Sequence, residues 1–181
     1  MDARPDTAAE ADRPPPAGWL AGPWSELGGW VALLTFAFDQ AHKWWMILVW
    51  GLKQGVRVEV TPFLDIVYVI NTGVSFGLLA HGGQWALAAF AVVTSLALWV
   101  WLARAGTNRV MAVSLGLIIG GALGNALDRL TLGGVADFFS LHAWGYYWYV
   151  FNIADVAIVA GVAGLLYDSF VTSRNDAVNR P

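Results

Sequence analysis

The chain has 181 residues, of which 57% are apolar, 14% aromatic and only 13% charged. Soluble domains carry about 25% charged residues, so this composition indicates a membrane protein. The net charge of −3, without a basic stripe, argues against a nucleic-acid partner. The absence of cysteine excludes disulfides, thiolate catalysis and Cys-ligated metals.

The chain is predicted to be a membrane all-α protein with a small β element. Residues 1–28 form a disordered or interfacial N-terminal tail, because their first part is rich in Pro, Ala and charge and has no apolar periodicity. A membrane domain of residues 29–170 and a cytoplasmic tail of residues 171–181 follow. Four apolar stretches in that domain reach the ~20 residues that cross a hydrocarbon core. They are Gly29–Leu52, Gln84–Ala103, Arg109–Leu127 and Trp148–Phe170.

Two connections between these stretches are long. In residues 53–83, apolar and charged residues alternate over Val56–Val60, which is typical of a half-buried strand. The β-branched and aromatic segment Asp65–Ile70 predicts a second strand, so we expect a small sheet on the membrane surface. The other connection, residues 129–147, leads into the aromatic run Trp144–Tyr149, which is typical of an interfacial belt and is a candidate cover for a site.

The basic residues predict the orientation in the membrane. With four spans both termini lie on one side, and that side has more basic residues than the other. The positive-inside rule therefore places the termini in the cytoplasm and both long connections outside. The residues compared are Arg4, Arg13, Arg104, Arg109, Arg174 and Arg180 on the first side, and Lys53, Arg57 and Arg129 on the second.

Two aspartates, Asp137 and Asp155, lie among aromatic, glycine and aliphatic residues near the ends of predicted spans. Carboxylates at membrane depth are costly and mark function. Either one alone is best explained by a structural hydrogen bond to a loop, but two at the same membrane level favour an acid/base pair. One would keep a proton while the other activates a water against a peptide carbonyl. The spacing leaves open which is which.

Other polar residues are spaced so that they share helix faces. Asp39 and Lys43 form an i,i+4 pair in the first stretch, for which mutual neutralisation is favoured over a proton relay. Asn125, Asp128 and Arg129 share a face at the outer end of the third stretch. The guanidinium of Arg129 would either bind a substrate carbonyl or phosphate, or pair with Asp128.

Asn71 and Gly73 predict a turn before the second stretch. Asn152 lies one helical turn before Asp155. No metal site is predicted, because the three histidines are scattered along the chain and no HExxH sequence occurs.

Taken together, these motifs resemble those of the lipoprotein signal peptidase family, also called signal peptidase II. The likeness covers about Gly29–Asp168, and five motifs in order are far more specific than any one of them. Val74, where the family usually has Ala, and the Pro-rich tail are departures. The matching strings are Asp39-Gln40-Ala-His-Lys43, Asn71-Thr-Gly73-Val-Ser-Phe76-Gly, Gly120-Gly-Ala-Leu-Gly124-Asn125-Ala-Leu-Asp128-Arg129, Val135-Ala-Asp137-Phe138 and Phe151-Asn152-Ile-Ala154-Asp155.

The resemblance implies a multi-pass aspartyl protease of the bacterial inner membrane whose site opens near the periplasmic face. Its substrates would be diacylglyceryl-modified prolipoproteins, cut just before the lipid-bearing cysteine, and Asp137 and Asp155 would be its catalytic dyad. It also implies an extracytoplasmic β-cradle, a short periplasmic helix, sensitivity to globomycin, and a monomer in contact with membrane lipids but without a cofactor. Residues implied to bind substrate are Asn71, Gly73, Asn125, Arg129 and Asn152, and those implied to be supporting are Asp39, Lys43, Gly124, Asp128 and Ala154.

Two rival interpretations remain. A small transporter or channel would use the intramembrane acids as an ion path, but the second and fourth stretches are almost wholly apolar below their outer ends. A non-catalytic binding or assembly protein would tolerate replacement of Asp137.

Overall fold

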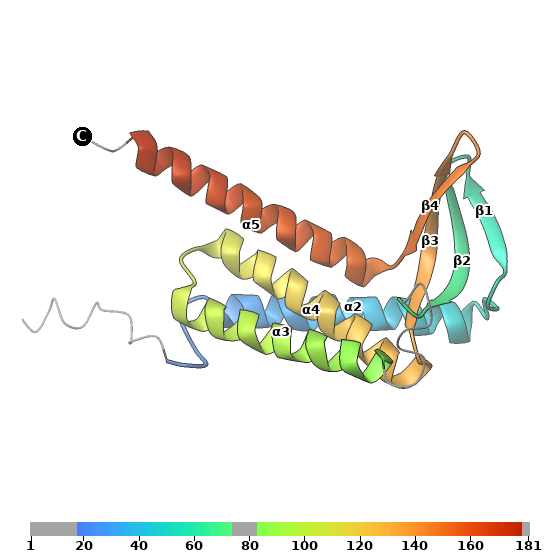
Figure 1. Ribbon diagram of the computed structural model, residues 1–181, viewed down its shortest axis with the longest axis horizontal. Coiled ribbons are helices and arrows are strands. Elements are labelled where there is room, and N and C mark those ends of the chain that lie inside the picture. Colours follow the sequence, from blue (N-terminus) through green and yellow to red (C-terminus); the bar gives the residue numbers. More distant parts are fainter. Residues whose placement is uncertain (1–17, 74–82, 179–181) are drawn as a thin grey trace, which may run out of the picture.

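The computed structural model describes residues 18–73 and 83–178, with side chains up to Arg174 in the last helix. Most of the predicted N-terminal tail, residues 74–82 of the first connection, and residues 179–181 lie outside the described residues. The described part is mostly helical, with a small sheet at one end of the helices (Figure 1).

Within the described residues, three helices are long and apolar enough to cross a membrane: α3 (Gly83–Ala105), α4 (Arg109–Leu132) and α5 (Ile153–Val178). The first predicted stretch is also helical, as α2 (Ser25–Trp44) continued by one π-helical turn, η1 (Trp45–Val49). This helix carries Asp39 and Lys43 and is not among the three candidates. The mainly helical membrane fold is therefore confirmed, whereas the fourth span stays a prediction.

Helix α4 is the centre of the helical part, since α2, α3 and α5 all pack against it. Its glycines permit close approach, as expected from the sequence. A Cβ on Gly120 would lie 2.4 Å from the carbonyl oxygen of Ala32 in α2, and one on Gly121 would lie 2.6 Å from that of Ala154 in α5. Larger residues at these positions would push the neighbouring helices away.

The ends of three helices differ from the sequence-based boundaries. Helix α2 begins at Ser25, inside the predicted tail of residues 1–28, and α5 continues to Val178, inside the predicted tail of residues 171–181. Helix α4 continues past Leu127 to Leu132 and ends at Gly133, whose φ of 73° suits a left-handed C-terminal residue. Helix α5 begins at Ile153, so the predicted start at Trp148 is wrong. The residues before Ile153 are aromatic and β-branched, and they pair with a neighbouring strand instead of continuing the helix.

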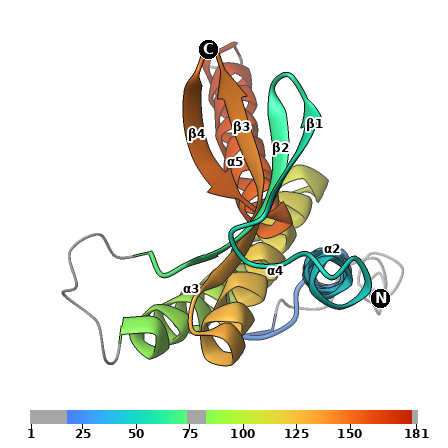
Figure 2. The same ribbon diagram turned by 90° about the vertical axis from the view of Figure 1, so that its right-hand side faces the viewer.

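The sheet has four antiparallel strands in the order β1 (Arg57–Thr61), β2 (Leu64–Asn71), β3 (Val135–Ala143) and β4 (Tyr146–Phe151). Both strands predicted in the first connection are confirmed. Strand β1 is exposed throughout, and not half-buried, because it lies at the sheet edge where side chains of both faces meet solvent or lipid. Figure 2 shows the two hairpins standing side by side above α2, α3 and α4, with α5 behind them.

The second connection contributes strands that the sequence did not predict. The aromatic run Trp144–Tyr149 is a two-residue turn followed by most of β4, not a covering loop. Both turn residues, Trp144 and Gly145, have positive φ values of 49° and 81°, as a tight hairpin turn requires. No separate short helix is found in the described parts of either connection.

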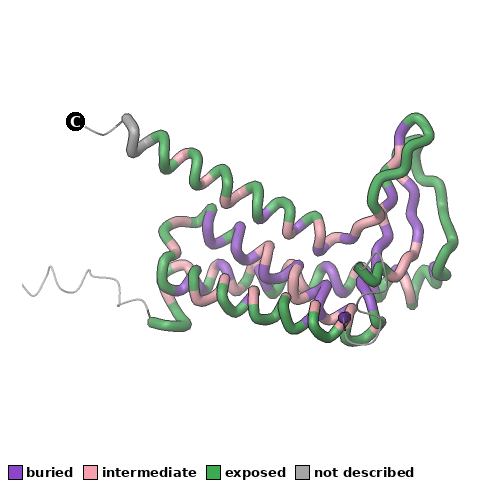
Figure 3. Tube along the Cα trace, viewed as in Figure 1, coloured by how far each residue is buried: buried purple, intermediate pink, exposed green. Residues whose placement is uncertain are grey.

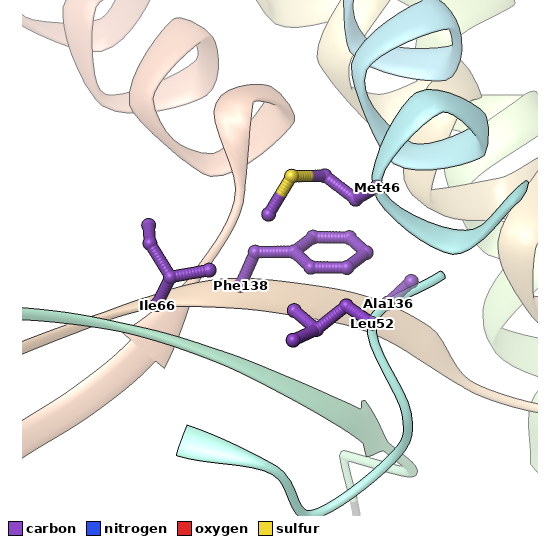
Figure 4. Packing of buried hydrophobic residues seen from close by; sticks show 5 residues of the cluster. All are labelled: Met46, Leu52, Ile66, Ala136 and Phe138. Atoms are coloured by element: carbon purple, nitrogen blue, oxygen red, sulfur yellow. The ribbon is translucent and has the colours of Figure 1, made fainter. Parts of the chain in front are cut away.

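A small apolar core joins the sheet to the end of the first helix. Met46 and Leu52 meet Ile66, Ala136 and Phe138 beneath the strands (Figure 4). Figure 3 shows that burial is concentrated along α4 and β3, while the outward sides of the helices are exposed. Because Ala136 and Phe138 are both fully buried, the backbone of β3 around Asp137 is firmly held.

Candidate active site

The fold brings together the two aspartates that the sequence singled out. Asp137 lies in β3 and Asp155 lies in the first turn of α5. Asn152, which is completely buried, contacts both: its Nδ2 donates to Asp137 Oδ1 at 2.6 Å, and its backbone N–H donates to Asp155 Oδ2 at 3.2 Å. One residue therefore holds both carboxyl groups in a common site.

The remaining oxygens of the pair are also hydrogen-bonded. Asn71 Nδ2, at the end of β2, donates to Asp137 Oδ2 at 3.0 Å, and Asn125 Nδ2, in α4, donates to Asp155 Oδ1 at 2.9 Å. The Asn71 amide is oriented in turn by the backbone N–H of Gly73, which donates to its Oδ1 at 2.9 Å. These amide donors restrict both carboxyl groups to one orientation.

Asp137 is electrostatically unusual. Burial raises its pKa from the ordinary value of 3.8 to about 6, although the hydrogen bonds from Asn71 and Asn152 act in the opposite direction. The nearby charge of Asp155 adds to the rise. The side chain is only 1% exposed, so the charged form lacks the solvation that water would provide. Asp137 therefore holds a proton to a higher pH than an ordinary carboxyl group does.

A buried ion cluster lies behind the two acids. Lys43 Nζ contacts Asp39 Oδ2 at 2.8 Å and Asp128 Oδ2 at 2.7 Å, and it donates to Asn125 Oδ1 at 3.1 Å. The predicted pairing of Asp39 with Lys43 is thus confirmed, within a group of three charges. Since Asp128 is bound by Lys43, the structure does not support its predicted alternative pairing with Arg129.

The two carboxylates of this cluster anchor the backbone beside each candidate acid. Asp39 Oδ1 accepts from the N–H of Ala154 at 2.9 Å, and Asp128 Oδ2 accepts from the N–H of Ala136 at 3.1 Å. These residues directly precede Asp155 and Asp137. Because one ammonium group bridges both anchors, the cluster links the segment bearing one acid to the segment bearing the other.

Gly124 and Gln40 complete the cluster. A Cβ on Gly124 would lie only 2.6 Å from Asp39 Oδ2, so this position has no room for a side chain. Gln40 Nε2 lies 3.2 Å from Asp39 Oδ2 and from the Gly124 carbonyl oxygen, and 3.0 Å from Asp128 Oδ1. Sequence reasoning assigned no role to Gln40. A neutral polar residue at membrane depth was the signal that could have revealed one.

Arg129 lies at the edge of the site and has a hydrogen-bond donor that is not engaged by the described residues. Its Nη1 donates to the carbonyl oxygen of Asn125 at 2.9 Å, which places the guanidinium above the last turns of α4. Among the described residues, its buried Nε has no hydrogen-bond partner. Buried donors are normally satisfied, so this N–H is available to a bound carbonyl group.

An apolar groove of about 400 Å³ leads from the site along α5. Among the described residues that line it, Asp155 is the only polar one, so an apolar surface lies directly beside this carboxyl group. The lining consists of Phe151, Asp155, Val156, Val159, Ala160 and Ala163.

A second buried carboxylate site lies within the sheet, apart from the pair. Asp65 contacts Arg57 through a charge-assisted hydrogen bond and His142 Nε2 at 3.0 Å. The hydrogen bond from Arg57 lowers the pKa of Asp65, which is therefore ionised at neutral pH. The sequence did not single out this cluster, because its members come from three different strands.

Comparison with known proteins identifies the family. Residues 31–171 match the family described as Signal peptidase (SPase) II. The chain is 49% identical over 151 residues to the lipoprotein signal peptidase of Methylocella silvestris, covering 82% of this chain and 88% of that one. It is 48% identical over 158 residues to that of Beijerinckia indica, covering 86% and 93%.

A solved structure of a bacterial membrane enzyme is also similar, with a TM-score of 0.71 and 30% identity over 83% of this chain and 91% of the other. The transporter interpretation has no support in these likenesses. With its helical membrane fold and a match over most of its length, the chain belongs to the signal peptidase II family of proteases.

Proposed function

We propose that this protein is an aspartic endopeptidase that removes signal peptides from diacylglyceryl-modified prolipoproteins, cutting before the lipid-modified cysteine. The observation that carries the proposal is the pair of buried carboxyl groups, Asp137 and Asp155, held by the same residue, Asn152. The relatives named lipoprotein signal peptidase, at 48–49% identity, support the choice of substrate.

The reaction needs one ionised and one protonated acid. The raised pKa of Asp137, about 6, favours this residue as the protonated acid, and Asp155 then acts as the base. Asp155 takes a proton from a water molecule, whose oxygen attacks the scissile carbonyl carbon, while Asp137 donates a hydrogen bond to the developing oxyanion. The tetrahedral intermediate then collapses, the C–N bond breaks, and the leaving amine of the cysteine receives a proton from the pair.

The surrounding residues have distinct roles in this proposal. Asn71, Asn125 and Asn152 orient the acids, and Gly73 orients Asn71. The unsatisfied Nε of Arg129 binds a carbonyl of the signal-peptide backbone. The supporting group, Asp39, Lys43, Gly124, Asp128 and Ala154, keeps the two acid-bearing segments at a constant separation.

The placement in the membrane follows from the same layout. We propose that α2 is a fourth span, that both termini are cytoplasmic, and that the sheet end of the molecule faces the periplasm from the bacterial inner membrane. The groove along α5 would then accept apolar parts of the substrate from the bilayer. The enzyme would act as a monomer and would be inhibited by globomycin.

The test is cleavage of a synthetic diacylglyceryl-modified prolipoprotein by the purified protein. Asp137→Asn and Asp155→Asn should each abolish cleavage. Asp168→Asn is the matched control: it lies on the same helix as Asp155 but far from the site, where Asn108 Nδ2 donates to it at 2.8 Å. It should cleave at the wild-type rate. Substantial cleavage by either of the first two variants would refute the dyad.

A further inference from the structure

The two edges of the sheet are built differently. Strand β1 ends the sheet on one side and includes Arg57 and Glu59, with Pro62 just after it. Charges and proline are the usual protection of an exposed edge against pairing with another chain. Strand β4 ends the sheet on the other side with the sequence YYWYVF, which has neither charge nor proline. In the described parts of the chain, β4 is therefore the edge that lies open to an added strand.

Strand β4 also leads directly to the candidate acids. Its last residue, Phe151, lines the groove that contains Asp155, and the next residue, Asn152, holds both acids. Figure 1 shows β4 descending from the tip of its hairpin to the start of α5. A peptide lying along the free edge of β4 would therefore reach the dyad at one end. With six residues, the strand can accompany about 20 Å of extended chain.

We propose that the free edge of β4 binds the substrate in an extended form, as a fifth strand, and so positions the scissile bond. The inference rests on the proposed function, because it deepens the description of how the same substrate is held. A helical segment shields its amides within its own hydrogen bonds, so a bond to be hydrolysed must be presented in extended chain.

The segment that β4 binds is the start of the mature protein, after the lipid-bearing cysteine. Strand β4 belongs to the sheet and lies beyond the start of α5. The apolar groove, in contrast, runs along α5 itself. The acyl chains and the signal sequence are apolar and stay with the bilayer, which leaves the following residues for the strand. Pairing through main-chain groups tolerates many side chains. One enzyme can then accept mature proteins that differ in sequence.

Synthetic lipopeptides with single N-methylated amides test the pairing without altering the enzyme. The methyl group is placed in turn on the second to the sixth residue after the cysteine. Since alternate amides of a strand face its neighbour, kcat/KM should fall about tenfold at every second position and little at those between. Equal effects at all positions, or none at any, would overturn the added strand while leaving the proposed function intact. Failure to cleave the unmethylated peptide would overturn both.

Disulfide trapping gives a second readout. The chain has no cysteine, and the cysteine of the substrate is blocked by its lipid, so introduced thiols are the only ones present. Tyr149→Cys is placed on β4, where the side chain is 90% exposed, and Val60→Cys on β1, 55% exposed, is its control. Both are made with Asp155→Asn to preserve the substrate. Peptide thiols at alternate positions are expected to form a disulfide with the Tyr149→Cys variant and not with the Val60→Cys variant. Equal disulfide formation with both variants would refute the proposal.

Discussion

Replacing Asp137 by Asn should stabilise the protein while abolishing its proposed activity. The folded protein raises the pKa of this carboxyl group to about 6, against an ordinary value of 3.8. Folding therefore opposes its ionisation. Below about pH 4 the carboxyl group is protonated, and its ionisation costs the folded wild type nothing. As the pH rises toward 6 the free energy of unfolding falls, and above that pH the full cost of ionisation is present. Asn resembles the protonated acid and has no penalty at any pH.

The size of the effect follows from the pKa difference and the hydrogen bonds. The difference between about 6 and 3.8 corresponds to about 3 kcal/mol. The amide of Asn carries an N–H directed at another amide donor, either Asn71 or Asn152, and one strained or lost hydrogen bond costs about 1 kcal/mol. The net gain is about 2 kcal/mol, which is roughly 4–8 °C in melting temperature for a chain of this size.

Thermal unfolding of the purified protein in detergent measures this gain at pH 8 and pH 4. The variant should melt higher than the wild type at pH 8 and no higher than the wild type at pH 4, where only the cost of the hydrogen bond remains. Asp65→Asn is a matched control, since it is equally buried in the same sheet but has a lowered pKa. Its stabilising charge is present at neutral pH and is lost on acidification, so this variant should be less stable than the wild type at pH 8. An Asp137→Asn protein that melts below the wild type at pH 8, or keeps its gain at pH 4, would refute the reasoning.

Three further changes probe the supports of the site. Lys43→Met leaves two buried carboxylates facing each other and should lower the free energy of unfolding by about 3–5 kcal/mol; an unchanged melting temperature would contradict the ion cluster. Gly124→Ala introduces a methyl group where Asp39 Oδ2 lies 2.6 Å away, and the displaced site should lose about 100-fold in kcat. A wild-type kcat would show that the cluster does not position the acids. Trp144→Asn replaces a 93% exposed residue at φ 49° by one that tolerates this conformation, and should stabilise the protein by about 1 kcal/mol in detergent. A loss of stability would mean that the indole itself holds the turn.

The local pattern of the sequence was sufficient for several elements. Long apolar runs predict α3, α4 and α5 because crossing a bilayer requires a minimum length of apolar helix. The segments that became β1 and β2 were predicted from alternation and from β-branched residues. The start of α5 was placed too early, since Trp148–Phe151 is apolar enough to pass for membrane helix and only its pairing with β3 makes it a strand.

The sequence by itself determined the membrane class, the main helices, and the candidate acids, because these depend on composition and on short spacings along the chain. Only the tertiary structure decided how the acids are held. Asn152 contacts both, and Lys43 connects the anchors of both through Asp39 and Asp128, which come from different helices. Contacts between residues more than 80 positions apart leave no local pattern. They arise when glycine-lined helices pack closely enough for buried charges to find partners.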